Sequence, residues 1–322
     1  MKDLPICIGL AGLGCVGQGL YDVVQKHYGG RIDIRRIAVK DPQKKRKVPS
    51  HLLCTDFETL LSDPEIKLIV ECIDDPNAAY ELCIQAFKRG KDVISANKQM
   101  IAQNLDLLIF HQRNSGQSLL YEAAVAASIP IIRLLESHFE EEQILSIEAI
   151  LNGTSNYILS KIQLEGLSFK EALAEAQAKG FAESDPSNDL EGKDAAAKAV
   201  ILAAHAFGKQ HRLSKVERNS IDASSCLALE PGLSHKCLAL LDAQSLQIKL
   251  SALAPDSEFN RINYERNAVQ VRSAIGGLHF YSGSGAGADA TASALLSDLF
   301  QWQRGFRYRY SKLKKAPLEV VV

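Results

Sequence analysis

Short apolar runs alternate with amphipathic stretches through the first third of the chain, and the runs are rich in β-branched residues. Five of them have the length of buried strands: Ile6–Leu10, Ile32–Val39, Leu68–Ile73, Asp92–Ala96 and Ser118–Ala123. Helical spacing of apolar residues follows the first run up to about Tyr28, and it returns over Asn77–Arg89 and Leu105–Arg113. This strand–helix–strand order predicts a doubly wound α/β domain with a parallel sheet.

The pattern changes from about Pro130 onward, where apolar and polar residues alternate within the strands. Strands are predicted at Ser146–Leu151, Leu246–Leu253 and Ala268–Ala274. Helices are predicted at Phe169–Lys179, Glu191–Phe207 and, after a glycine-rich segment, Ala290–Phe300. We therefore expect one domain made of residues 1–130 and 283–322, and a second α+β domain of residues 131–282 with a mostly antiparallel sheet.

Composition narrows the class of partner. The 322 residues are 46% hydrophobic and carry 37 basic against 38 acidic side chains, a formal net charge of −1. Without a basic field, nucleic acid and anionic membrane are not expected as primary partners, which favours a small molecule. No apolar run reaches the length of a membrane span, and the seven cysteines form no CxxC pair. We expect a soluble cytoplasmic protein with buried, reduced thiols and no catalytic transition metal.

A glycine motif follows the first predicted strand. Gly12-Leu13-Gly14-Cys15-Val16-Gly17 fits GxGxxG between a strand and a helix, which is the position that the dinucleotide-binding motif requires. The glycines allow a tight turn and a close approach of the backbone, and the helix N-terminus offers unpaired N–H groups to a pyrophosphate. The motif predicts a Rossmann-type domain that binds a dinucleotide.

The end of the second predicted strand bears on the choice of dinucleotide. Val39 is followed by Lys40 and Asp41, and then by the basic run 44–47. A cation at Lys40 favours the 2′-phosphate of NADP. The alternative is that Asp41 bonds the ribose hydroxyl of NAD and that the basic run is a solvated loop.

Two further groups of polar residues are candidates for chemistry. Ser95-Ala96-Asn97-Lys98 follows a predicted strand, at the sheet edge where ligands of such folds bind, although a lone Lys98 is more typical of a surface. Asp194 and Lys198 lie four residues apart on one predicted helix face, a spacing that is common in exposed ion pairs. Several acidic residues precede them at the same loop–helix junction: Glu183, Asp185 and Asp189.

Six ordered segments make the chain similar to homoserine dehydrogenases over nearly its whole length. They are GLAGLGCVG, SANK, YEAAVAASIPII, ILNGTSNYIL, AQAKGFAESDPSNDLEGKDAAAK and GSGAGADATASALLSD. The resemblance implies reversible NAD(P)-dependent reduction of L-aspartate 4-semialdehyde to L-homoserine, in threonine, methionine and isoleucine biosynthesis. It also implies a homodimer joined through the middle, substrate-binding domain, and a short form without the C-terminal ACT regulatory domain.

The resemblance assigns roles to individual residues. It places the cofactor at Gly12, Leu13, Gly14, Cys15, Val16, Gly17, Lys40, Ser95, Ala96, Asn97, Lys98 and Gly287. It assigns substrate binding to Gly153, Thr154, Glu183 and Asp189, and Glu183 is expected to bind the substrate ammonium. Lys198 is the expected proton donor and acceptor, Lys98 is the second candidate, and Asp194 positions Lys198 or a water. Main-chain groups of Glu122, Val125, Ala127 and Ile129 are expected to hold a structural sodium ion.

The chain departs from the family pattern at three places. Ala127-Ser128 stands where relatives have Gly-Gly, Asp74-Asp75 replaces two small residues, and Ala290-Thr291 replaces Pro-Thr. A different NAD(P)-dependent amino-acid oxidoreductase and a non-catalytic cofactor-binding sensor remain as alternatives, because a fold alone does not determine a substrate.

Overall fold

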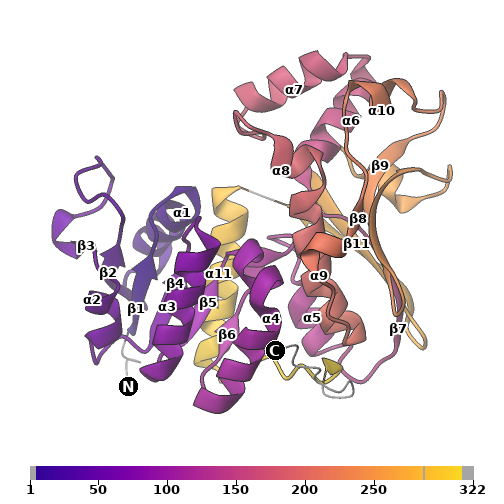
Figure 1. The fold of residues 1–322 in the computed structure, drawn as a ribbon. Helices are drawn as coiled ribbons and strands as arrows, with labels where there is room; N and C mark the ends of the chain where they lie inside the picture. The colour runs from indigo at the N-terminus through magenta and orange to yellow at the C-terminus, as the bar shows by residue number, and fades with distance from the viewer. Residues whose placement is uncertain (1–4, 286, 314–322) are drawn as a thin grey trace. The chain divides into compact units, whose positions relative to one another are not determined.

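The computed structural model describes residues 5–285 and 287–313, which fall into two compact units (Figure 1). Of the described residues, 5–127 and 287–308 form unit 1, and 128–285 and 309–313 form unit 2. These boundaries differ from the expected 1–130 plus 283–322. Strand β12 (Gly277–Ser284) belongs to the sheet of unit 2, and Glu136 of unit 2 accepts hydrogen bonds from the backbone N–H groups of Arg309 and Tyr310. Residues 286 and 314–322 of the expected domain lie outside the described residues.

Unit 1 is built on a six-stranded parallel sheet with the order β3-β2-β1-β4-β5-β6. The strands are β1 (Ile6–Ala11), β2 (Ile32–Ala38), β3 (Leu53–Cys54), β4 (Leu68–Glu71), β5 (Asp92–Ser95) and β6 (Leu119–Leu120). Strand β1 lies at the centre between β2 and β4, so its Ile8 and Leu10 side chains are fully buried. The order reverses beside β1, which is where ligands bind in sheets of this type.

The helices of unit 1 connect these strands in the order of a doubly wound fold (Figure 1). They are α1 (Cys15–Val23), which continues as a π segment (Val24–Tyr28), α2 (Glu58–Ser62), α3 (Pro76–Lys88), α4 (Lys98–Ser115) and α11 (Ala288–Gln303). Two short 3-10 turns occupy Ser50–Leu52 and Glu122–Ala124. Helix α1 packs against α11, and α3 packs against α4.

Unit 2 contains a second six-stranded sheet with the order β12-β11-β7-β9-β10-β8. Its strands are β7 (Ile144–Ile150), β8 (Glu217–Arg218), β9 (His235–Asp242), β10 (Leu246–Ala252), β11 (Arg266–Ser273) and β12 (Gly277–Ser284). All neighbouring pairs are antiparallel except β10 with β8. The expected mostly antiparallel sheet is therefore confirmed.

The helices of unit 2 carry the polar residues that the sequence singled out. They are α5 (Ile131–Glu136), α6 (Gly153–Glu165), α7 (Phe169–Ala178), α8 (Ser187–Leu190), α9 (Lys193–Phe207) and α10 (Ala223–Leu227), with 3-10 turns at Leu213–Lys215 and Glu258–Arg261. Helix α9 packs on strands β7, β9 and β10. Nearly all residues of α9 are buried, and many of them are alanines, whose small side chains allow close packing on every face of the helix.

Several sequence expectations were wrong at the edges of elements. The run Ser118–Ala123 forms only a two-residue strand, since the chain turns into a 3-10 helix at Glu122. Helix α4 starts at Lys98 rather than Leu105, because the side chain of Asn97 caps it by accepting from the Met100 N–H.

The thiols are all reduced, but only Cys83 and Cys237 are buried, and Cys15 is exposed. Among the described residues, no helix is long and apolar enough to cross a membrane.

Candidate active site

The glycine turn lies between β1 and α1, and two of its glycines are required by backbone contacts. Gly12 has a φ of +93°, and a Cβ there would lie 2.3 Å from the carbonyl oxygen of Cys72. A Cβ on Gly17 would lie 2.2 Å from the Gly12 carbonyl oxygen. At Gly14, the N-cap of α1, a Cβ would meet no other atom within 4 Å, so open space faces the helix N-terminus. That space and the N–H groups of the first turn fit a dinucleotide pyrophosphate.

A cavity of about 350 Å³ adjoins this turn within unit 1. Leu13, Gly14 and Cys15 line one part of it, and the basic run Lys44–Lys47 lines another. The basic residues thus lie at the dinucleotide turn. Lys40 is exposed and is not among the lining residues. Asp41 instead accepts the N–H groups of Gln43 and Lys44, which shapes the basic loop.

The SANK segment forms the loop between β5 and α4. Ser95 is buried, and its hydroxyl donates to Glu71 and accepts from the Asn97 N–H at 3.0 Å. The Asn97 amide donates to the Ile73 carbonyl at 2.8 Å, so the loop after β5 is tied to the loop after β4. Lys98 is half-buried in the first turn of α4. The departure at Asp75 also has a structural reason, because its carboxylate caps α3.

A buried ion pair lies in the first turns of α9 in unit 2. The Lys198 ammonium donates to Asp194 Oδ2 and to the Leu151 carbonyl, both at 2.7 Å. Lys198 is 8% exposed and Asp194 is 3% exposed, so this is not the solvated surface pair that the spacing alone suggests. The Asn152 amide donates to Asp194 at 2.8 Å and to Asp189 at 2.7 Å, which joins the two carboxylates. Sequence reasoning assigned no role to Asn152, although its position before α6 is typical of an N-cap.

Asp189 lies at the edge of this cluster on α8. The Thr154 hydroxyl oxygen lies 3.1 Å from this carboxylate and 2.6 Å from the Phe181 carbonyl, so its single proton is within hydrogen-bond reach of both acceptors. Burial raises the pKa of Asp189, and the negative charge of Asp194 adds to that effect. Hydrogen bonds and an ion pair therefore bring together four of the predicted site residues, Thr154, Asp189, Asp194 and Lys198.

The other predicted substrate residues have different surroundings. Glu183 is exposed on the loop before α8, and its backbone carbonyl accepts from Gln177. Gly153 is needed for packing, because a Cβ there would lie 2.8 Å from the Glu265 carbonyl oxygen.

In unit 1, the predicted cofactor residue Gly287 is the N-cap of α11. It has a φ of +107°, and a Cβ there would meet no other atom within 4 Å. Thr291 donates to the Gly287 carbonyl and secures this helix start two residues before the expected Ala290.

The expected sodium residues are divided between the units. Glu122, Val125 and Ala127 belong to unit 1, and Ile129 belongs to unit 2. Ala126 and Ala127 have φ angles of 55° and 39°, a left-handed conformation that favours glycine. Within the described ranges, no group of three or more His, Cys, Asp or Glu side chains is placed to hold a metal ion.

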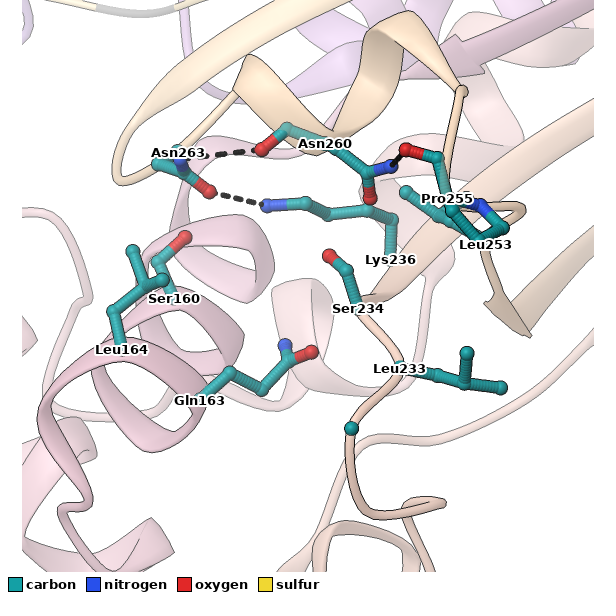
Figure 2. A pocket seen from close by; sticks show the side chains of 11 residues that line it. Ser160, Gln163, Leu164, Leu233, Ser234, Lys236, Leu253, Pro255, Asn260 and Asn263 are labelled. Atoms are coloured by element: carbon teal, nitrogen blue, oxygen red, sulfur yellow. Dashed lines mark hydrogen bonds between the residues drawn. The ribbon is translucent and has the colours of Figure 1, made fainter.

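A second cavity, of about 340 Å³, lies in unit 2 and contains none of the predicted site residues (Figure 2). Lys236 at its wall is 1% exposed, and burial lowers its pKa to about 8. Its ammonium donates to Asn156 Oδ1, the Ile262 carbonyl and Asn263 Oδ1, at 3.0, 2.6 and 3.0 Å. An ammonium has three protons, so these three bonds account for all of them. Lys236 therefore clamps the loop before β11 and offers no donor to a ligand.

A glycine turn at the topological switch point of a parallel sheet is typical of oxidoreductases that use a dinucleotide. The family model of the homoserine dehydrogenase NAD binding domain matches residues 12–122, and the model for homoserine dehydrogenase matches residues 130–300. The chain belongs to the homoserine dehydrogenase family. Its activity is that of the family, the reversible NAD(P)-dependent reduction of L-aspartate 4-semialdehyde to L-homoserine.

Individual relatives are similar over most of their length. The homoserine dehydrogenase of Bacillus subtilis is 33% identical, with 98% of this chain and 79% of the relative covered. That of Synechocystis sp. is 36% identical, with 92% and 73% covered. The solved structure of a homoserine dehydrogenase from Thiobacillus denitrificans superposes with a TM-score of 0.86 at 33% identity, and 99% of this chain and 76% of that chain are covered.

Proposed function

We propose that Lys198 is the group that exchanges a proton with the substrate oxygen, and that Asp194 holds it in place. The buried contact between Lys198 and Asp194 carries this proposal, because an ammonium with fixed partners delivers its proton from a defined position. The Leu151 carbonyl provides a second fixed contact. As the carbonyl oxygen of the aldehyde gains negative charge, a cation at this position stabilises it and then protonates it. The bound nicotinamide supplies the hydride.

The acidic residues around this pair suit the rest of the substrate. Asp189 belongs to the same cluster because it is hydrogen-bonded to Asn152, and Thr154 belongs to it because it is hydrogen-bonded to Asp189. We assign Asp189 and Thr154 to the hydroxyl end of homoserine. Glu183 is exposed, and its negative charge is opposite to that of the substrate ammonium. We therefore assign the binding of the ammonium to Glu183. Lys98 belongs to unit 1, and it remains the alternative proton donor.

The dinucleotide site is assigned to the glycine turn, the loop 95–98 and Gly287. The cavity at the turn supports a preference for NADP, because four consecutive basic residues, Lys44–Lys47, line it together with Gly14. We therefore assign the selection of the 2′-phosphate to the loop 44–47 as well as to Lys40. We further propose a cytoplasmic homodimer and a main-chain sodium site at residues 122–129, on the resemblance to the family.

The assignment of Lys198 is tested by Lys198→Ala with Lys193→Ala as a matched control. Lys193 lies on the same helix, is half exposed and pairs with Glu191 at the surface. We expect the Lys198 variant to lose ~10²-fold or more in kcat while its dissociation constant for NADPH stays within about twofold. The control should keep its turnover. Circular dichroism checks that both variants fold, since Asp194 loses its partner.

Normal turnover by a folded Lys198→Ala protein would contradict the assignment and direct attention to Lys98. The cofactor preference is tested separately by Lys40→Ala and Arg46→Ala, measured with NADP and NAD. A loss confined to NADP identifies a residue that binds the 2′-phosphate. Equal losses with both cofactors would refute that role for the residue changed.

A further inference from the structure

Glu71 is a buried carboxylate that none of the roles above includes. It is the last residue of β4, and its side chain is 0% exposed. Strand β4 lies between β1 and β5, and Glu71 is in register with Ala11 on one side and Ser95 on the other. The carboxylate therefore lies at the edge of the sheet from which the glycine turn and the SANK loop both begin.

Each oxygen of this carboxylate is hydrogen-bonded to a different loop. Oε1 accepts from the Ile73 N–H at 2.5 Å, and Oε2 accepts from the Ser95 hydroxyl. The Ser95 oxygen accepts from the Asn97 N–H, and the Asn97 amide donates back to the Ile73 carbonyl. Ile73 is thus held at its N–H by Glu71 and at its carbonyl by Asn97. The four residues form a closed network between the loops after β4 and β5.

The peptide held by this network supports the glycine turn. A Cβ on Gly12 would lie 2.3 Å from the Cys72 carbonyl oxygen and 3.1 Å from the Ile73 nitrogen, so the Cys72–Ile73 peptide packs directly against Gly12. Such close packing transmits a displacement of the peptide to the turn. The position of Gly12 therefore depends on the hydrogen bonds of Glu71.

We propose that Glu71 is a positioning residue of the dinucleotide site, whose ionised carboxylate holds the Cys72–Ile73 peptide, and through it Gly12, in the arrangement that receives the pyrophosphate. The proposal rests on dinucleotide binding at the glycine turn. Glu71 itself is not expected to touch the cofactor. Its effect is on affinity, through the two loops that it joins.

Protonation of Glu71 changes the network in a definite way. The ionised carboxylate accepts two charge-assisted hydrogen bonds, whereas the protonated acid accepts the Ile73 N–H only through a neutral oxygen, which is a weaker acceptor, and its own proton competes with that of the Ser95 hydroxyl. Burial raises the pKa of Glu71 to about 7, with Asp74 adding to that effect and the bonds from Ser95 and Ile73 opposing it. The half-buried thiol of Cys72 and the buried thiol of Cys83 also lie near the carboxylate. The holding contact therefore weakens as pH falls through neutrality.

Glu71→Gln reproduces the acid form, because an amide donates where the protonated carboxyl would. Asp92→Asn is the matched control: Asp92 is a buried carboxylate at the opposite end of the neighbouring β5, where it accepts from Ser118 N–H and Trp302. The dissociation constant for NADPH is measured by fluorescence from pH 5.5 to 8.5. We expect Glu71→Gln to bind at least ten-fold more weakly than wild type at pH 8.5, equivalent to about 1.4 kcal/mol, and almost equally at pH 5.5.

The control should bind NADPH within about twofold of wild type at every pH. A pH-independent loss in Glu71→Gln, or an equal loss in Asp92→Asn, would mean a merely structural role and overturn the proposal. Tighter binding by Glu71→Gln would also overturn it, by showing that repulsion between the carboxylate and the pyrophosphate dominates. If Glu71→Gln does not fold, Glu71→Asp keeps the charge but shortens the side chain by one methylene, so it should bind NADPH more weakly than wild type at pH 8.5, and equal binding would overturn the proposal. Failure of wild type to bind NADPH would instead refute the dinucleotide site itself.

Discussion

The glycine turn allows structural and ligand-binding roles of glycine to be separated by two single changes. Gly12 is confined by backbone, with a φ of +93° and the Cys72 carbonyl 2.3 Å from a Cβ. Gly14 has a φ of −78°, which any residue adopts, and open space around it. Gly12→Ala should therefore damage the fold, and Gly14→Ala should leave the fold intact while it obstructs the dinucleotide.

The magnitudes follow from these contacts. A left-handed conformation costs an alanine about 1–2 kcal/mol, and overpacking against backbone adds about 1–3 kcal/mol. Gly12→Ala is thus expected to lower the free energy of unfolding by about 2–5 kcal/mol, a fall in Tm on the order of 5–15 °C. For Gly14→Ala, the reduced entropy of the unfolded chain and a slightly poorer N-cap are each below about 1 kcal/mol and opposite in sign.

Thermal unfolding by circular dichroism and NADPH binding by fluorescence measure the two effects independently. Gly14→Ala should unfold within about 2 °C of wild type and yet bind NADPH about ten-fold more weakly or worse, a change of about 1.4 kcal/mol. The reasoning is refuted if Gly14→Ala binds NADPH normally, or if both variants lose the same stability. The first result would move the pyrophosphate away from α1, and the second would show that the open space is not open in solution.

Two further predictions concern unit 2 and the segment that precedes it. Glu136 accepts hydrogen bonds from His205 at 2.5 Å and from two backbone N–H groups. Burial by itself would raise the pKa of Glu136, but the charge of His205 and these hydrogen bonds outweigh burial and lower the pKa. The stability that this carboxylate contributes is present above its unfolded pKa and is lost as pH falls through its lowered folded pKa, so Glu136→Gln should lower Tm at pH 7, and the difference from wild type should shrink as the pH is taken into the acid range. The double change Ala127→Gly with Ser128→Gly should alter kcat/KM less than ten-fold, because relief of about 1–2 kcal/mol of left-handed strain at Ala127 changes the free energy of unfolding and leaves the groups assigned to the reaction in place. A gain of ~100-fold would show that the native side chains obstruct the reaction.

Local patterns in the sequence predicted the elements that depend on local rules. Five of the six parallel strands of unit 1 and the turn at Gly12 and Gly14 were predictable, because apolar runs and a glycine motif express short-range requirements. The two-residue strand β3 was missed, as were β8, β9 and β12 in unit 2. Strand β9 is largely buried where it pairs with β7, whereas β12 has no buried residue and forms through its pairing with β11.

What the sequence by itself determined is the set of chemical groups and the family to which they belong. Burial and pairing were decided by the tertiary structure. The spacing of Asp194 and Lys198 is the same in a solvated surface pair, and only the packing of α9 on its sheet encloses them. Asn152, which joins Asp189 to Asp194, and Glu71, which joins two loops, act across 42 and 24 residues of sequence. No local pattern records such contacts, because they form only when strands and helices distant in the chain are brought together by folding.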